Sequence, residues 1–235
     1  PIFSCLGLWS LFAMAPLSYL AEGTAAALAL GAFVAVFTAL QWRFAGWVYS
    51  AVLAHLIALL AYAGTLHQGE GTLITGNFAI ALLLGVTLLG NAALLRLHRG
   101  AQDKGEFKYN ALLPLFGTLG LWMLYLLAPL QFARDYTACA WALASTLTVF
   151  LALRLKTRGW LANALLVQLM AGGLFLASLQ HAETAVLSGN LNAAILLGLT
   201  LLANAALLAK LGKDSTSNLL LPILSSLGLW SLYLI

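Results

Sequence analysis

The sequence predicts an all-α, polytopic membrane protein with about nine transmembrane helices in tandem, parallel four-helix repeats. Composition and an internal duplication predict this class. Of the 235 residues, 63% are hydrophobic and 8% are charged, and the mean hydropathy is +0.97. Because about a quarter of the residues in soluble domains are charged, this chain cannot cover a soluble globule with polar surface. The composition therefore excludes a soluble enzyme and a nucleic-acid-binding protein.

Apolar runs of membrane-spanning length follow one another along the whole chain. A span needs about 20 mainly apolar residues, and the predicted spans are 2–20, 24–42, 46–66, 73–97, 112–131, 137–154, 160–180, 186–209 and 219–235. The runs are continuous rather than alternating, which excludes a transmembrane barrel. Charged residues mark the connections, such as Arg43 after the second span and 154–158 after the sixth. The only sizeable loop is 96–110.

A duplication groups these spans in fours. Pro1 recurs as Pro114, an offset of 114 − 1 = 113, and the match continues without a gap. The pairs include Gly7 and Gly120, Trp9 and Trp122, Glu70 and Glu183, Asn77 and Asn190, and Asn91 and Asn204. A third copy begins near Pro222. The predicted domains are therefore 1–110, 111–217 and an incomplete repeat at 218–235, and we expect the chain to be a piece of a longer protein.

The basic residues predict the orientation of the chain. If the spans alternate, all of the 11 Lys and Arg residues except Arg134 lie on the side of the N-terminal end. Short basic loops stay in the cytoplasm. Since each repeat has an even number of spans, successive repeats enter the membrane from the same side. We therefore expect a multi-pass protein of the bacterial inner membrane, with the N-terminal end and the basic loops cytoplasmic.

His55 and its repeat partner Gln168 are candidate solute- or lipid-binding residues near the middle of a span. They could line a passage, or each could form a hydrogen bond between helices. Replacement of His by Gln removes proton chemistry and keeps a hydrogen bond, which favours the second interpretation.

Two pairs of asparagines are the other candidates for solute or lipid binding. Asn77 and Asn190 each follow a glycine at the start of a predicted helix, where they could cap the helix or form a site for a headgroup or solute. Asn91 and Asn204 lie late in the same helices, where a packing bond between helices explains them at least as well as a solute contact.

The sequence gives no support to catalysis. All seven acidic and all eleven basic residues lie at predicted span ends or in loops, so no paired carboxylates or clustered metal ligands stand at membrane depth. We expect no enzymatic activity, no cofactor and no metal site.

Several segments resemble a known family. The stretches 136–143 (YTACAWAL), 168–176 (QLMAGGLFL) and 187–190 (LSGN) resemble those of a family of large bacterial membrane proteins known only by a domain of unknown function, number 2339. The likeness is best over 136–209. It implies a longer parent chain with many more spans and implies no activity or catalytic residue.

Two functional hypotheses follow. The first is a protein, part of a larger multi-spanning chain, that binds or moves a lipid-like or weakly polar solute. The alternative is a non-transporting membrane scaffold or subunit that packs against partner proteins. The expected partners are membrane lipids and other membrane subunits or further repeats of the same chain, with no nucleic acid. A solute pathway predicts polar residues that share a cavity, whereas a scaffold predicts separate helix contacts.

Overall fold

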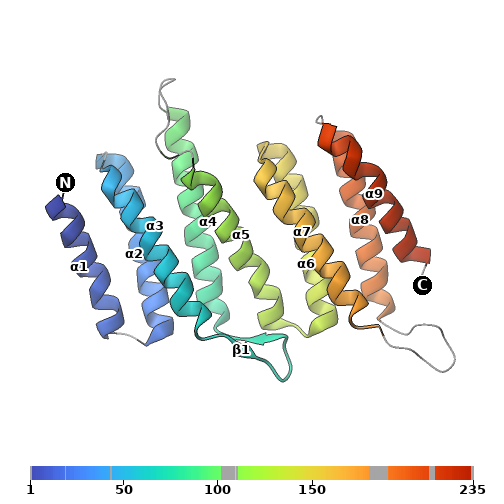
Figure 1. Ribbon diagram of the computed structural model, residues 1–235, viewed down its shortest axis with the longest axis horizontal. Helices are drawn as coiled ribbons and strands as arrows, with labels where there is room; N and C mark the ends of the chain where they lie inside the picture. Colours follow the sequence, from blue (N-terminus) through green and yellow to red (C-terminus); the bar gives the residue numbers. More distant parts are fainter. Residues whose placement is uncertain are drawn as a thin grey trace. The chain divides into compact units, whose positions relative to one another are not determined.

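A computed structural model describes residues 2–18, 20–42, 44–101, 109, 111–179, 190–211 and 215–233. These residues form helices and one small hairpin (Figure 1). The helices are α1 (Ile2–Ser18), α2 (Ala21–Trp42), α3 (Ala45–Ala63), α4 (Phe78–Ala101), α5 (Leu112–Gln131), α6 (Arg134–Leu155), α7 (Arg158–Leu176), α8 (Leu191–Leu211) and α9 (Ser215–Tyr233). The hairpin strands are β1 (His67–Gln68) and β2 (Ile74–Thr75). The prediction of an all-helical chain is confirmed.

Seven of these helices are long and apolar enough to cross a membrane, counted over the described residues. They are α2 to α8, which makes the chain a helical, multi-pass membrane protein by length and composition. The first and last predicted spans contain the shorter apolar stretches Ser4–Leu17 and Leu220–Leu229. The crossing of the membrane by α1 and α9 stays a prediction.

The chain divides into two compact units. Unit 1 contains α1 to α5, and unit 2 contains α6 to α9 together with the short segment 70–73 from the hairpin. The compact units are therefore offset by one helix from the sequence repeats, because α5 opens the second repeat and packs with the first. The contact responsible involves Gly120 of α5, whose Cα lies so close to α4 that a Cβ would meet Leu89 Cγ at 2.7 Å.

Alanine forms most of the helix contacts at the centre of unit 1. The small apolar residues of α2 and α3 that are at most 2% exposed are Ala25, Ala29, Ala32, Ala35, Val36, Ala39, Val48, Ala51, Ala54 and Ala58. Their spacing of three and four residues places them on one face of each helix. Small side chains let helix backbones approach closely, which is the main source of packing energy between helices in lipid.

Unit 2 uses the same kind of packing. Helix α6 contacts α7 and α8, and α8 contacts α9. Ala142, Ala164 and Ala171 are fully buried at these contacts. Leu197, Leu201 and Leu208 of α8 contribute larger side chains to the same core. The hydroxyl of Ser145 adds a polar contact by donating a hydrogen bond across to the carbonyl oxygen of Ala164, at 2.9 Å.

The hairpin replaces the predicted start of the fourth span. We expected that span to begin at residue 73, and the helix begins at Phe78 instead. The antiparallel pairing of His67 with Thr75 and of Gln68 with Ile74 uses the backbone groups that a helix would need. The backbone N–H of Leu73 also bonds to the carbonyl oxygen of Phe132 within unit 2, at 3.1 Å.

A sharp turn joins α6 to α7. Lys156 ends α6 in the left-handed conformation, with φ 54° and ψ 42°. Its backbone N–H bonds to the carbonyl oxygen of Ala152 and so closes the end of the helix. Glycine is the usual residue at this position, since a Cβ is disfavoured there.

Candidate functional site

Three buried polar side chains lie together in unit 1. His55 comes from α3, and Thr87 and Asn91 come from α4, where their spacing of four residues puts them on one helix face. They are 1%, 5% and 0% exposed. We call these three residues the first polar cluster. Such burial of polar groups at membrane depth is costly unless the groups are hydrogen-bonded.

The repeat places an equivalent set in unit 2. Gln168 of α7 and Thr200 and Asn204 of α8 stand 113 positions after His55, Thr87 and Asn91, since 168 − 55, 200 − 87 and 204 − 91 all equal 113. We call these residues the second polar cluster. All three are buried. The duplication in the sequence therefore produces the same placement of polar residues in both units.

The side chain of Gln168 links the second polar cluster. Its Nε2 donates to Thr200 Oγ1 at 3.1 Å, and its Oε1 accepts from Asn204 Nδ2 at 3.5 Å. The hydroxyl of Thr200 donates in turn to the backbone carbonyl oxygen of Leu197 at 2.9 Å. The bond to Asn204 is at the long limit and is the weaker of the two. Both polar atoms of Gln168 thus join α7 to α8.

The bonding in the first polar cluster has a different direction. His55 Nδ1 lies 3.2 Å from the carbonyl oxygen of Ala51, which can only accept, so this nitrogen carries the proton. In a neutral imidazole the other nitrogen then accepts, and Nε2 lies 3.3 Å from Thr87 Oγ1. The hydroxyl of Thr87 is therefore the donor to His55, whereas the hydroxyl of Thr200 accepts from Gln168.

The hydroxyl of Thr87 has a choice of acceptors. It also lies 2.9 Å from the carbonyl oxygen of Leu83 and 3.1 Å from that of Leu84, both in its own helix. A hydroxyl has one proton, so the bond to His55 competes with these two bonds. The polar link between α3 and α4 is consequently weaker than the link between α7 and α8.

Within the part of the chain that the structure describes, Asn91 has no hydrogen-bond partner at either polar atom of its side chain, although it is completely buried. The comparison with unit 2 gives the reason. In unit 2, Gln168 bonds to Thr200 through its amide nitrogen and so can bond to Asn204 through its amide oxygen. In unit 1, His55 has two ring nitrogens, and Nδ1 bonds to Ala51 of its own helix while Nε2 bonds to Thr87. His55 therefore has no polar atom left for Asn91. Phe116 of α5 stands edge-on to the His55 ring, with 5.7 Å between the ring centres, and offers no polar group. The Oδ1 atom of Asn204 also has no partner among the described side chains and backbone groups.

Asn77 and Asn190 cap helices. Asn77 Oδ1 accepts from the backbone N–H groups of Ala79 and Ile80 at 3.1 and 3.4 Å, at the start of α4. Its Nδ2 donates to Glu22 Oε2 of α2 at 2.8 Å. The backbone carbonyl of Asn77 accepts a bond from the Tyr62 hydroxyl at 3.0 Å. Asn77 thus ties together the starts of two helices and the end of a third.

Asn190 makes the same cap at the start of α8, where its Oδ1 accepts from the backbone N–H of Ala193 at 3.2 Å. Capping was one of the two interpretations of these asparagines, and this geometry satisfies it. In unit 2 the position equivalent to Glu22 holds Asp135, whose carboxylate stands on a side chain that is one methylene shorter.

The sequence interpretation missed the two threonines and Glu22. Thr87 and Thr200 are related by the repeat and each precedes an asparagine by four residues, so the pattern Thr-x-x-x-Asn was visible in both repeats. Glu22 could not be assigned to Asn77 from sequence, because 55 residues separate them and only the packing of α2 against α4 brings them together.

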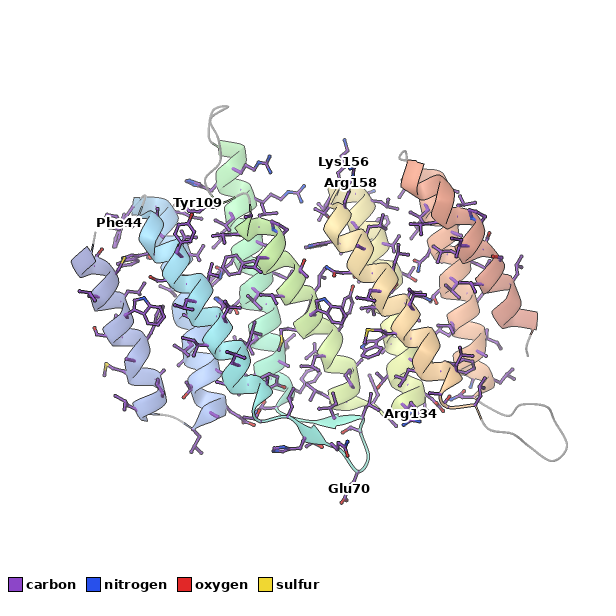
Figure 2. All side chains as sticks on the ribbon, in the orientation of Figure 1. Phe44, Glu70, Tyr109, Arg134, Lys156 and Arg158 are labelled. Atoms are coloured by element: carbon purple, nitrogen blue, oxygen red, sulfur yellow. The ribbon has the colours of Figure 1, made fainter. Side chains whose placement is uncertain are left out.

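The two ends of unit 2 differ in charge. Figure 2 shows Lys156 and Arg158 at one end of the unit and Arg134 at the opposite end. Arg154 and Lys210 lie in the last turns of α6 and α8, on the side of Lys156. The guanidinium of Arg154 stands 5.3 Å from the centre of the Phe150 ring. We call this set of Arg154, Lys156, Arg158 and Lys210 the basic end of unit 2.

In unit 1, His98 and Arg99 lie in the last turn of α4. Tyr109 lies between α4 and α5, with its ring centre 6.1 Å from that of Tyr49. Partial burial, with a smaller effect of Tyr49, raises the pKa of the Tyr109 hydroxyl above its usual value. The phenol therefore stays a neutral hydrogen-bonding group at neutral pH.

The described side chains offer little for metal chemistry. Among the residues that the structure describes, no group of three or more His, Cys, Asp or Glu stands close enough to hold a metal ion. The polar clusters consist of amides, hydroxyls and one imidazole, which are groups suited to hydrogen bonding across helices.

The fold, with its seven described helices of membrane-spanning length, defines an α-helical integral membrane protein. Comparisons with models of known families, with curated proteins and with solved structures found no match. The resemblance of 136–209 to the family with domain of unknown function 2339 therefore stays a prediction from the sequence.

Proposed function

We propose that the protein is a non-transporting scaffold of the membrane, in which buried polar residues hold the helices of each repeat together. The single observation that carries this proposal is the bonding of Gln168. Both of its polar atoms bind residues of α8, so this buried side chain is engaged in the link between α7 and α8.

The placement of the other candidate residues supports the same function. His55, Asn91, Gln168 and Asn204 are all at most 2% exposed, and the bonds of each cluster stay inside its own unit. A solute pathway would need polar groups that water or a headgroup can reach. The side chains of Asn77 and Asn190 accept hydrogen bonds from helix N–H groups, which a solute would have to displace.

A second candidate function rests on Asn91. Both polar atoms of its amide are buried without a partner, and such a group is an available contact for a small polar ligand. The protein would then bind or move a lipid-like or weakly polar solute through unit 1. The cluster in unit 2 gives this alternative less support, because its amides bind each other.

The orientation belongs to the same proposal. We place the basic end of unit 2, and Arg99 of unit 1, on the cytoplasmic face of a bacterial inner membrane, because short basic loops are retained in the cytoplasm. The resemblance noted above supports the bacterial assignment and a larger parent protein of many spans. The expected neighbours are lipids and other membrane helices.

Reconstitution into vesicles separates the two functions. Vesicles of phosphatidylethanolamine and phosphatidylglycerol with a trace of fluorescent phosphatidylglycerol would be treated with dithionite, which bleaches only the outer leaflet. The scaffold proposal predicts the same bleached fraction with and without protein, and the same permeability to glycerol in stopped-flow light scattering. If the protein increases the bleached fraction or the glycerol permeability, and Asn91→Leu abolishes this increase with unchanged helical circular dichroism, the scaffold proposal is overturned in favour of the solute function.

A further inference from the structure

Three helices of the chain are copies of one segment. Gly7 of α1, Gly120 of α5 and Gly228 of α9 occupy the same place in the repeat, with the sequence Leu-Gly-Leu-Trp around each. A glycine at a helix surface lets another helix approach closely. The three copies can therefore be compared for what lies against this glycine.

In α5, the glycine is covered by α4. A Cβ on Gly120 would meet Leu89 Cγ at 2.7 Å and the backbone nitrogen of Leu89 at 3.0 Å. The contact is reciprocal, because a Cβ on Gly85 of α4 would meet Leu124 Cδ2 of α5 at 2.8 Å. A leucine of α4 thus packs on the glycine of α5, and a leucine of α5 packs on the glycine of α4.

In α9, the glycine is covered in the same way by α8. A Cβ on Gly228 would meet Leu202 Cγ at 2.9 Å and the carbonyl oxygen of Gly198 at 3.2 Å. Leu202 and Gly198 are the repeat counterparts of Leu89 and Gly85, since 202 − 89 and 198 − 85 both equal 113. The two covering helices share the pattern Gly-x-Thr-Leu-Leu, at 85–89 in α4 and 198–202 in α8.

In α1, the glycine is uncovered. Among the described residues, no atom lies within 4 Å of the position that a Cβ on Gly7 would take. The rest of this face is also open. Leu17 is 86% exposed, whereas its counterpart Leu130 in α5 is 7% exposed. Ser10 is exposed, whereas its counterpart Met123 is buried.

The opposite face of α1 is packed normally. Leu8, Phe12 and Ala15 are buried, and α1 contacts α2 and α3. The ring of Phe12 lies against Gly31 of α2, where a Cβ would meet Phe12 Cε1 at 2.9 Å. The helix is thus held in unit 1, and the face that contains Gly7, Ser10, Leu11, Met14 and Leu17 is open. We call this set the α1 face.

We propose that the α1 face is a docking surface for a transmembrane helix of another repeat, one that carries the pattern Gly-x-Thr-Leu-Leu of α4 and α8. The leucine of that helix packs on Gly7, and its glycine receives Leu11, the counterpart of Leu124. This inference deepens the proposed scaffold function and rests on it, because it names the partner that the scaffold holds.

A second copy of this chain does not supply the partner. The helices that carry the pattern are α4 and α8, and in each of them the Gly and Leu positions are already covered by α5 or α9. The partner helix is therefore one whose pattern is still uncovered. Lipid chains would pack less well on the α1 face than a helix, because a helix can place a leucine side chain directly against Gly7.

A peptide of residues 190–211 is the probe, since it is an α8 helix freed from α9. The peptide would carry a donor dye and be titrated into the full chain in phosphocholine micelles. The acceptor dye would be attached to a single cysteine at position 18, in a variant with the substitutions Cys5→Ser, Ser18→Cys and Cys139→Ser. Energy transfer between the two dyes measures binding. The peptide is expected to bind saturably. Gly7→Phe should weaken this binding about tenfold, because the ring occupies the space of the leucine.

Matched controls make the result specific. Gly173→Phe puts the same ring at an exposed glycine of α7 that has no atom within 4 Å of its Cβ position, and should leave the affinity unchanged. A Ser10→Trp variant tests the α1 face at a second position and should also weaken binding. In the peptide, Gly198→Leu should weaken binding because it removes the space for Leu11.

Equal affinity for Gly7→Phe and Gly173→Phe, or no saturable transfer, would overturn the docking proposal. Gly7-dependent self-association without peptide, seen by sedimentation in density-matched micelles, would overturn it in favour of a second copy as partner. Neither result affects the scaffold proposal, which the lipid and glycerol assays in vesicles test separately.

Discussion

The two polar clusters occupy equivalent positions and use different chemistry. In unit 2, Gln168 donates to Thr200 and accepts from Asn204, so α7 and α8 are joined by two hydrogen bonds between side chains. In unit 1, His55 binds Ala51 of its own helix and Thr87, and Asn91 is left without a partner. The difference shows that the repeat retains a polar link between the third and fourth helices and does not retain its donor and acceptor pattern.

This difference bears on function. A relay of protons or a solute site would require the same kind of group in both units if both units performed it. An imidazole and a primary amide share only the capacity to donate and accept hydrogen bonds. Packing is therefore the role that both clusters can perform.

The largest expected losses of stability in the two units come from changes at the helix caps. Asn77→Ala should lower the free energy of unfolding by about 1–2 kcal/mol, because it removes the cap of α4 and the bond to Glu22. Asn190→Ala should cost about 1 kcal/mol, the value of a cap. Unfolding by sodium dodecyl sulfate in mixed micelles measures both. Equal losses would mean that the Glu22 bond adds nothing.

The next largest losses should come from Gln168 and His55, and they should differ between the units. Gln168→Leu leaves the amide of Asn204 buried with no partner and should cost about 1–2 kcal/mol. His55→Leu should cost about 0.6 kcal/mol, because the hydroxyl of Thr87 keeps the carbonyl oxygens of its own helix. The same titration, followed by circular dichroism, checks both. A greater loss from His55→Leu would reverse the order of the two clusters.

The two buried asparagines should differ in the sign of their effect. Asn204→Leu should destabilise the protein by about 0.6 kcal/mol through the loss of its bond to Gln168. Asn91→Leu should be neutral or stabilising, because it replaces an unpaired buried amide by an apolar group of similar size. A loss of stability in Asn91→Leu would indicate a partner, such as a bound water, for this amide.

The smallest expected effect comes from making unit 1 resemble unit 2. His55→Gln supplies an amide that Asn91 can bind and should raise the free energy of unfolding by about 0.5 kcal/mol. This gain in the free energy of unfolding should vanish when His55→Gln is combined with Asn91→Leu. If His55→Gln gives the same gain with Asn91 and with Asn91→Leu, the added glutamine does not act through Asn91.

The sequence predicted the helices better than their connections. Continuous apolar runs located each helix to within a few residues, because the length of a span and its exclusion of charge are physical requirements of the bilayer. The apolar residues Leu73 and Ile74 were assigned to the fourth span, although they belong to the hairpin region. Hydropathy cannot separate an apolar strand of two residues from the first turn of a helix.

The sequence also located the polar positions without their partners. Repeat symmetry was enough to pair His55 with Gln168 and Asn91 with Asn204. The direction of each hydrogen bond depends on which atoms the packing of two helices brings within about 3.5 Å. The missing partner of Asn91 follows from the reach of a side chain on another helix, so it required the structure.

The most direct test of the account is a double-mutant cycle between Gln168 and Asn204. Gln168→Leu, Asn204→Leu and the double variant would be unfolded by sodium dodecyl sulfate in mixed micelles, and the coupling energy calculated from the three losses. If these residues serve to join α7 to α8, the coupling should be favourable by about 0.6 kcal/mol. A coupling of zero would contradict the claim that the buried polar residues hold the helices together.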